Sequence, residues 1–205
     1  MESSLWDAAQ AGDLRALKYL LEEGGVDPNV ADSDGWTALH FTMVGELGSV
    51  DVLETLLKWG ADPNAKNKYG ETPIFFANDA ASAHILIEAG AKVLDAIDDD
   101  GDTPLHSASS EGRLRMVRFL ILEAGGKISV NAQNRRGNTP LHEAVQDQQY
   151  HIVEVLLQHG CADPTILNDN CQSAIDMARE NITSLRINPV SKLGRKFILR
   201  RIIPI

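Results

Sequence analysis

Thr103-Pro104-Leu105-His106 and Thr139-Pro140-Leu141-His142 are two copies of the tetrapeptide that decides the fold of this chain. Weaker copies occur elsewhere, namely Thr37-Ala38-Leu39-His40, Thr72-Pro73-Ile74-Phe75 and Ser173-Ala174-Ile175-Asp176, with Ser3 as the degenerate first member. The repeats therefore start near residues 3, 37, 72, 103, 139 and 173, at intervals of 31 to 36 residues. Regular spacing of this size predicts stacked copies of one supersecondary unit.

The residues of each unit predict a turn followed by two helices. A turn glycine such as Gly101 or Gly137 supplies a positive φ, and the Thr two positions later is suited to cap a helix. Proline fits the first helical position, where its missing N–H would have no partner in any case. The next segment has apolar residues at spacings of three and four, which predicts a second, amphipathic helix. The glycines expected to end these second helices are Gly24, Gly60, Gly90, Gly125 and Gly160.

These residues resemble the ankyrin repeat, a family whose unit is a β-turn followed by two antiparallel helices. The resemblance covers about six repeats and residues 2–187. It implies an all-α repeat solenoid, elongated and curved, whose degenerate terminal repeats act as caps. We therefore expect one ankyrin repeat domain over residues 1–187 and a separate C-terminal tail over residues 188–205.

Departures from the pattern distinguish this chain, and repeat four is one of the affected repeats, with extra residues that include Lys127 and Ile128. Repeat two has about two extra residues around positions 44–48, and repeat three, residues 72–91, is about two or three residues short. In the last repeat Cys171 stands where the turn glycine belongs, as expected of a capping repeat. We expect the adjacent insertion and deletion to change the local stacking angle.

The charge of the chain is unevenly distributed. Its 205 residues include 19 Lys and Arg and 29 Asp and Glu, a formal net charge of −10. The tail carries five basic residues and no acid, so the preceding 187 residues carry −15. An acidic surface repels a phosphate backbone, so we expect no nucleic acid partner. For the tail, three interpretations stay open: a helix docked on repeat six, which its apolar residues favour, a disordered segment, or a basic anchor for a partner, a lipid or an import receptor.

The sequence shows no catalytic motif. His40, His106 and His142 belong to the repeat signature, where we expect them to join the Thr cap to a neighbouring turn. Cys161 and Cys171 are too few for a disulfide framework and are wrongly spaced for zinc. We therefore expect no enzyme, no cofactor, no metal and no small-molecule substrate. With no signal peptide pattern and no apolar run long enough for a membrane span, we expect a monomer in the cytoplasm and also in the nucleus.

The resemblance implies a binding surface on the concave side, formed by the turn tips and the first helices. Matching positions give an aromatic zone in repeats two and three, an acidic zone in repeat four and a basic step in repeat five. We expect Trp36 and Tyr69 to be exposed, whereas Phe41 and Phe76 either join them or turn inward. The expected partner-binding residues are Trp36, Phe41, Lys68, Tyr69, Phe76, Asp99, Asp100, Asp102, Arg135 and Arg136.

The function that these features favour is a non-enzymatic protein interaction module, acting as an adaptor, an inhibitor or an assembly factor. Two alternatives stay open at this point. One is an acidic, chaperone-like binder of a basic protein, and the other is a regulatory subunit of an enzyme complex. The partner itself is not named by the sequence, because repeat scaffolds serve unrelated functions.

Overall fold

The computed structural model describes residues 4–44, 49–124 and 128–184, with side chains described as far as residue 180. In these ranges the chain forms ten α-helices and one 3₁₀-helix, with two isolated β-bridges in place of strands. The chain divides into two compact units, Met1–Asp99 and Asp100–Ile205, called unit 1 and unit 2 below. The predicted domain boundary at residue 187 and the whole tail lie outside the described residues.

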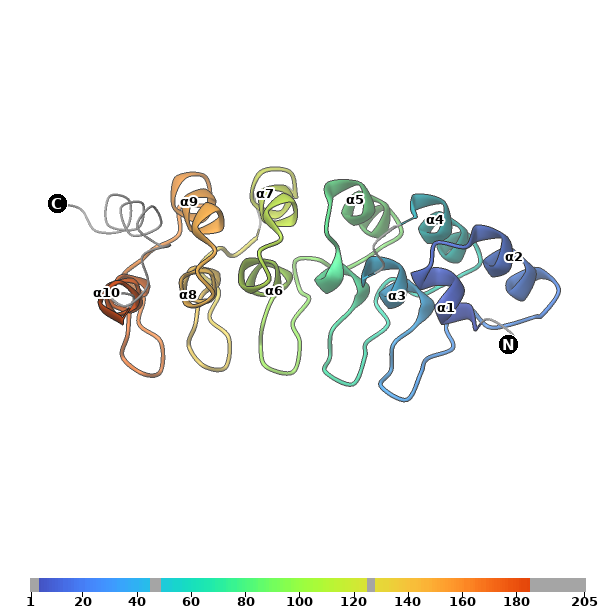
Figure 1. Ribbon diagram of the computed structural model, residues 1–205, viewed down its shortest axis with the longest axis horizontal. Helices are drawn as coiled ribbons and strands as arrows, with labels where there is room; N and C mark the ends of the chain where they lie inside the picture. The colour runs from blue at the N-terminus through green and yellow to red at the C-terminus, as the bar shows by residue number, and fades with distance from the viewer. Residues whose placement is uncertain (1–3, 45–48, 125–127, 185–205) are drawn as a thin grey trace. The chain divides into compact units, whose positions relative to one another are not determined.

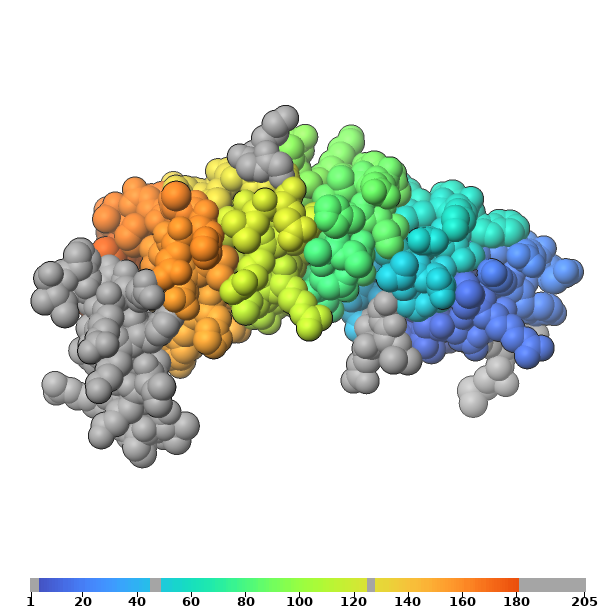
Figure 2. All heavy atoms as spheres, turned by 90° about the horizontal axis from the view of Figure 1, so that it is seen from above, coloured from blue at the N-terminus to red at the C-terminus, as the bar shows by residue number. Residues whose placement is uncertain are grey.

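Unit 1 consists of two layers of helices with hairpins on one side (Figure 1). The first helices pack side by side, α1 on α3 and α3 on η1, and the second helices pack as α2 on α4 and α4 on α5. Figure 2 shows the atoms of α4 and α5 adjoining in the layer of second helices. The helices are α1 (Leu5–Gln10), α2 (Leu14–Glu22), α3 (Ala38–Val44), α4 (Val50–Lys58), η1 (Pro73–Phe76) and α5 (Ala80–Glu88).

Unit 2 repeats the two-layer arrangement. Here α6 packs on α8 and α8 on α10, while α7 packs on α9 in the second layer. The predicted apolar stripe of α7 is the buried one, since Met116, Val117 and Leu120 are fully buried. The helices are α6 (Pro104–Ser110), α7 (Leu114–Leu122), α8 (Pro140–Gln146), α9 (Tyr150–Gln158) and α10 (Ala174–Ser184).

The signature histidines link each repeat to the next within a unit. In His40, His106 and His142 the Nδ1 atom accepts a hydrogen bond from the backbone N–H of the Thr cap, at 3.1 Å in all three cases. Because Nδ1 is an acceptor, the proton of the neutral ring sits on Nε2. That proton is donated to a backbone carbonyl of the following hairpin, and the acceptors are Glu71 at 3.2 Å, Asn138 at 3.0 Å and Gln172 at 3.1 Å. The expected role of these histidines is confirmed, and we call these contacts the histidine links.

Repeat three departs from the predicted pair of α-helices. Its first helix is the single 3₁₀ turn η1, which ends at Ala77 in an extended conformation. Phe75 occupies the histidine position, so Thr72 has no ring nitrogen with which to build a capping box. The deletion in this repeat therefore shortens its first helix to one 3₁₀ turn that has no side-chain cap.

The hairpin glycines combine a left-handed backbone with close contact between neighbouring hairpins. Gly137 has a φ of +71°, and a Cβ at this position would lie 2.8 Å from the backbone nitrogen of Asp169. Cys171 adopts the same conformation with a φ of +57°, as its place at the turn-glycine position predicts. The adjoining hairpins are also joined by backbone bonds, such as Asp169 N–H to the Arg136 carbonyl at 3.1 Å.

Two of the predicted helix stops are displaced by one residue, and a third, Gly125, lies outside the described residues. Gly60 and Gly90 have positive φ values after α4 and α5, as expected. After α2 and α9 the left-handed residues are instead Gly25, at +59°, and Cys161, at +53°. The last turns of these two helices close one residue later, so Gly24 and Gly160 precede the left-handed position.

No helix in the described part of the chain has the length and apolar character needed to cross a membrane.

The histidine links predict a loss of stability in mild acid. Burial lowers the pKa of His40, His106 and His142 below the ordinary value of 6.5. The unfolded chain therefore binds more protons than the folded chain once the pH falls below 6.5. We expect the free energy of unfolding, measured by urea denaturation, to be fully present above pH 6.5 and to decrease as the pH falls below it.

His106→Gln should reduce this pH dependence, whereas the exposed His151→Gln serves as the matched control and should leave it unchanged. An unfolding free energy that stays constant from about pH 7.5 to about pH 5.5 would contradict the assignment.

The glycine contacts predict a graded pair of variants. A Cβ added at Gly60 would have no atom within 4 Å. Gly60→Ala should therefore lower the unfolding free energy only by the strain of placing alanine in a left-handed conformation, about 1 kcal/mol. Gly137→Ala adds the clash with Asp169 and should cost about 2 to 3 kcal/mol. Denaturation curves of the two variants test the difference, and equal losses would show that the close hairpin contact is unimportant.

Candidate functional site

Four aromatic rings form a continuous, half-buried patch on the hairpin and first-helix side of unit 1. Trp36 lies centrally, with its ring centroid 4.7 Å from that of Phe76 and 5.5 Å from that of Phe41. Trp6 extends the patch, since its ring centroid lies 6.4 Å from that of Phe41. Each of the four side chains keeps part of its area open to solvent. We call Trp6, Trp36, Phe41 and Phe76 the aromatic surface.

The local sequence holds these rings in place. The backbone N–H of Trp36 donates to the Asp32 carboxylate at 2.8 Å, which fixes the residue at the end of its hairpin. The indole N–H of Trp6 donates to the carbonyl of Val30 at 3.0 Å. Beneath the patch the buried His40 ring lies 5.6 Å from Trp36. The histidine link of repeat two therefore also supports the aromatic surface.

The structure places the two phenylalanines between the two interpretations left open for them. Phe41 and Phe76 neither turn fully inward nor stand free, because both pack against the indole of Trp36. The expectation that Trp36 is exposed is only partly correct for the same reason, since its ring lies between two others. Trp6 was missed as a site residue, although its place at the histidine position of repeat one was a usable signal.

The second hairpin of unit 1 carries an exposed tyrosine. Tyr69 is 54% exposed, as expected, and the ammonium of Lys68 lies 5.0 Å from the centre of its ring. Lys68 also pairs with the carboxylate of Asp34, and this hydrogen bond is the main cause of the raised pKa of Lys68. Asp99 is exposed, and its backbone N–H donates to the Tyr69 carbonyl at 2.8 Å. Lys68, Tyr69 and Asp99 thus lie at the outer edge of the hairpins.

Unit 2 presents a polar network where unit 1 presents rings. Glu143 stands at the position of Phe41 and Phe76 in its repeat, yet its carboxylate is buried, with 4% of the residue exposed. One carboxylate oxygen accepts hydrogen bonds from the side-chain amides of Asn134 and Asn138, both at 3.1 Å, and from the Arg136 guanidinium at 3.2 Å.

This network contains two of the residues predicted to bind a partner. Asp102 accepts a hydrogen bond from the Asn134 side chain at 2.7 Å and lies 3.8 Å from the Arg136 guanidinium. Asp102 of the predicted acidic zone and Arg136 of the predicted basic step therefore pair with each other, through side chains that are 19% and 58% exposed. Arg135 is exposed, and its backbone N–H donates to the carbonyl of Asp100, which is exposed too. Of the predicted charged residues of unit 2, Asp100, Arg135 and Arg136 are exposed, whereas Asp102 is only partly exposed.

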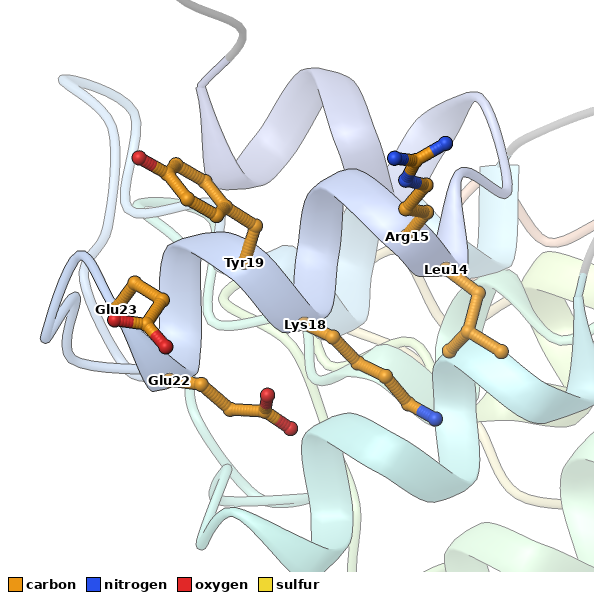
Figure 3. A pocket seen from close by; sticks show the side chains of 6 residues that line it. All are labelled: Leu14, Arg15, Lys18, Tyr19, Glu22 and Glu23. Carbon is orange, nitrogen blue, oxygen red and sulfur yellow. The ribbon is translucent and has the colours of Figure 1, made fainter.

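An open hollow along α2 offers no chemistry of its own. Six side chains fan outward from this helix and its end, with charges of both signs interspersed (Figure 3). They come from one element and do not converge on a common point, as the groups of an active site must. The residues around the hollow are Leu14, Arg15, Lys18, Tyr19, Glu22 and Glu23.

Among the described residues, no three or more His, Cys, Asp and Glu side chains are grouped so that they could hold a metal ion.

Comparison with known proteins agrees with this geometry. A family model described as ankyrin repeats (3 copies) matches residues 5–96, 45–134 and 78–168. The chain belongs to the ankyrin repeat family. Ankyrin repeats generally serve as protein interaction modules, so the hairpin and first-helix side is the part of the chain to examine for a partner.

Relatives share the repeats within longer proteins. The chain is 41% identical over 76 residues to the 2-5A-dependent ribonuclease of Mus musculus, which covers 37% of this chain and 10% of the relative. It is 34% identical over 128 residues to the putative ankyrin repeat protein L86 of Acanthamoeba polyphaga mimivirus, covering 58% and 21% respectively. Identity to the tyrosine-protein kinase HTK16 of Hydra vulgaris is 32% over 127 residues, a match that covers 59% of this chain and 16% of the kinase. The match thus spans about a fifth or less of each of these proteins.

The buried network predicts unequal effects for its members. Glu143→Ala leaves the amides of Asn134 and Asn138 buried without their acceptor, so we expect a loss of about 2 to 4 kcal/mol of unfolding free energy. Arg136→Ala should cost under about 1 kcal/mol, because the Arg136 side chain is 58% exposed. Denaturation with guanidinium chloride measures both, and a larger loss for Arg136→Ala would contradict the network as described.

Proposed function

We propose that this chain is a non-enzymatic protein interaction module that binds a partner protein through its hairpin and first-helix side. It acts as an adaptor, an inhibitor or an assembly factor. The single observation that carries the proposal is the aromatic surface, in which rings from three consecutive repeats lie together and remain half open to solvent.

The composition of this surface supports a protein partner. Interface hot spots are rich in tryptophan and cluster where a partner can exclude the remaining water. Other large apolar side chains with high exposure, such as Tyr19, Trp59 and Leu122, belong to the second helices or their ends and lie outside the aromatic surface. Tyr69 adds an accessible aromatic side chain at the edge of the same side of unit 1. Scattered exposed residues are normal for any protein, whereas a contiguous patch marks a binding site.

A second candidate, an acidic binder of a basic protein, is favoured by the distribution of charge between the units. Residues 1–99 contain 18 Asp and Glu against 6 Lys and Arg, a formal charge of −12. Residues 100–205 contain 11 against 13, a formal charge of +2. The acidic character therefore resides in the half that carries the aromatic surface. Such a field accelerates and orients the approach of a cationic partner.

The proposed compartment is the cytoplasm, and also the nucleus, with the chain acting as a monomer. Support comes from the thiols, since Cys161 and Cys171 are both exposed and neither forms a disulfide. Exposed free thiols are suited to a reducing environment.

Affinity capture from the native cell tests the proposal. The double variant Trp36→Ala/Tyr69→Ala should retain about tenfold less partner than the wild type, because it removes hot-spot area. The double variant Trp59→Ala/Tyr19→Ala removes the same two residue types from exposed positions elsewhere in unit 1, and should retain the partner as the wild type does. Equal retention by both variants would place the recognition surface elsewhere.

A further inference from the structure

We propose that the aromatic surface binds an extended segment of the partner that has a large apolar side chain at its centre and a Lys or Arg on each side. This inference rests on the proposed function and adds the chemistry of the ligand. It follows from three features of unit 1: the contiguous rings, the carboxylates at their two ends and the charge of the unit.

The first carboxylate belongs to Asp7. Asp7 lies two residues after Leu5, just as Phe41 lies two residues after Leu39, so both occupy the same position in their repeats. Because α1 packs on α3, this position places Asp7 at the repeat-one end of the aromatic surface. Its carboxylate accepts hydrogen bonds from the backbone N–H and the hydroxyl of Ser4, which lower the pKa of Asp7. Asp7 is therefore an exposed and ionised carboxylate at physiological pH.

The second carboxylate belongs to Glu71. Glu71 precedes the Thr cap of repeat three, which is the position that Trp36 occupies in repeat two. It therefore marks the repeat-three end of the aromatic surface. Its carboxylate accepts a hydrogen bond from the Asn67 side chain at 2.6 Å, and its backbone carbonyl accepts the histidine link from His40. Both contacts hold Glu71 in a fixed orientation while leaving it partly exposed.

The spacing of the two carboxylates sets the length of the ligand. Packed helices lie about 8 to 10 Å apart, so repeats one and three are separated by about 16 to 20 Å. An extended chain rises about 3.3 Å per residue, so about five to six residues span this distance. Because successive side chains of an extended chain point to opposite faces, two cationic side chains that both reach the surface lie an even number of positions apart, here about six. An apolar side chain between them on the same face contacts Trp36 and its neighbours.

Charge selects this ligand over a neutral or acidic one. In the described part of unit 1, residues 4–44 and 49–99 carry 16 acidic and 6 basic side chains. A lysine within the unit already shows the pairing that we propose, since Lys68 lies over the Tyr69 ring and pairs with Asp34. A cation beside both a ring and a carboxylate gains from each of these interactions.

Fluorescence anisotropy with the full chain and labelled synthetic peptides tests the proposal. The probe is Arg-Ser-Leu-Ser-Phe-Ser-Arg, whose Arg, Leu and Phe side chains share one face of an extended chain. Its two comparison peptides have Glu in place of both Arg, or Ala in place of Leu and Phe. We expect the probe to bind about tenfold or more tighter than either comparison peptide, and to weaken as salt is added. Equal binding of the Glu peptide would overturn the proposal.

Variants locate the peptide on the surface. Asp7→Asn/Glu71→Gln keeps the hydrogen-bond acceptors that hold these side chains and removes their charges, and should weaken the probe about fivefold or more. Trp36→Ala should weaken it about tenfold. The matched controls are Asp51→Asn and Trp59→Ala, both exposed positions on α4 or at its end, and they should have no effect. Loss of binding in the controls to the same degree would overturn the assignment.

The outcomes also separate this inference from the proposed function. If the probe does not bind, or binds independently of Asp7 and Glu71, while capture of the cellular partner still depends on Trp36 and Tyr69, the ligand chemistry is wrong and the interaction surface stands. If capture is also independent of Trp36 and Tyr69, both proposals fail.

Discussion

A buried neutral histidine that joins a repeat to the next is the interaction on which repeats two, four and five depend. One helix pair cannot bury its apolar face alone, so its stability comes from its neighbours. His40, His106 and His142 each accept from their own Thr cap and donate to the next hairpin, which fixes the distance and the angle between the two. The hairpin glycines permit this close contact, because a Cβ in their place would meet the neighbouring backbone. The arrangement of the hairpins, and so of the side chains they carry, follows from these links.

The same framework supports different surfaces in the two units. In unit 1 the positions before the Thr cap and after the histidine hold Trp36, Phe41 and Phe76, which pack on one another and stay half open. In unit 2 the position after the histidine of α8 holds Glu143, whose carboxylate is enclosed by asparagine amides and Arg136. A partner can therefore cover aromatic rings in unit 1, whereas in unit 2 it contacts polar side chains that already form hydrogen bonds with one another.

The sequence predicted those parts of the structure that depend on local pattern. The Thr and His signature, the left-handed glycines of the hairpins and the apolar stripes of the second helices depend on fixed spacings, and they were found correctly. The 3₁₀ turn of repeat three was missed, because a shortened repeat can lose its residues at several places. The pairing of Asp102 with Arg136 was missed as well, because it joins hairpins more than 30 residues apart. The burial of Glu143 was missed because it depends on how the side chains of the preceding hairpin fold back onto its carboxylate. The partial burial of Trp36 was missed too, because it depends on the packing of Phe41 and Phe76 against its ring.

The three tryptophans of the chain provide the most direct test of the central claim, that the aromatic surface is where the partner binds. Their indole N–H groups can be followed separately by NMR of the ¹⁵N-labelled protein while the retained partner is added. The account predicts that the signals of Trp6 and Trp36 shift or broaden with added partner, and that the signal of Trp59, at the end of α4, stays in place. A shift confined to Trp59, or no change at Trp36 with saturating partner, would contradict it.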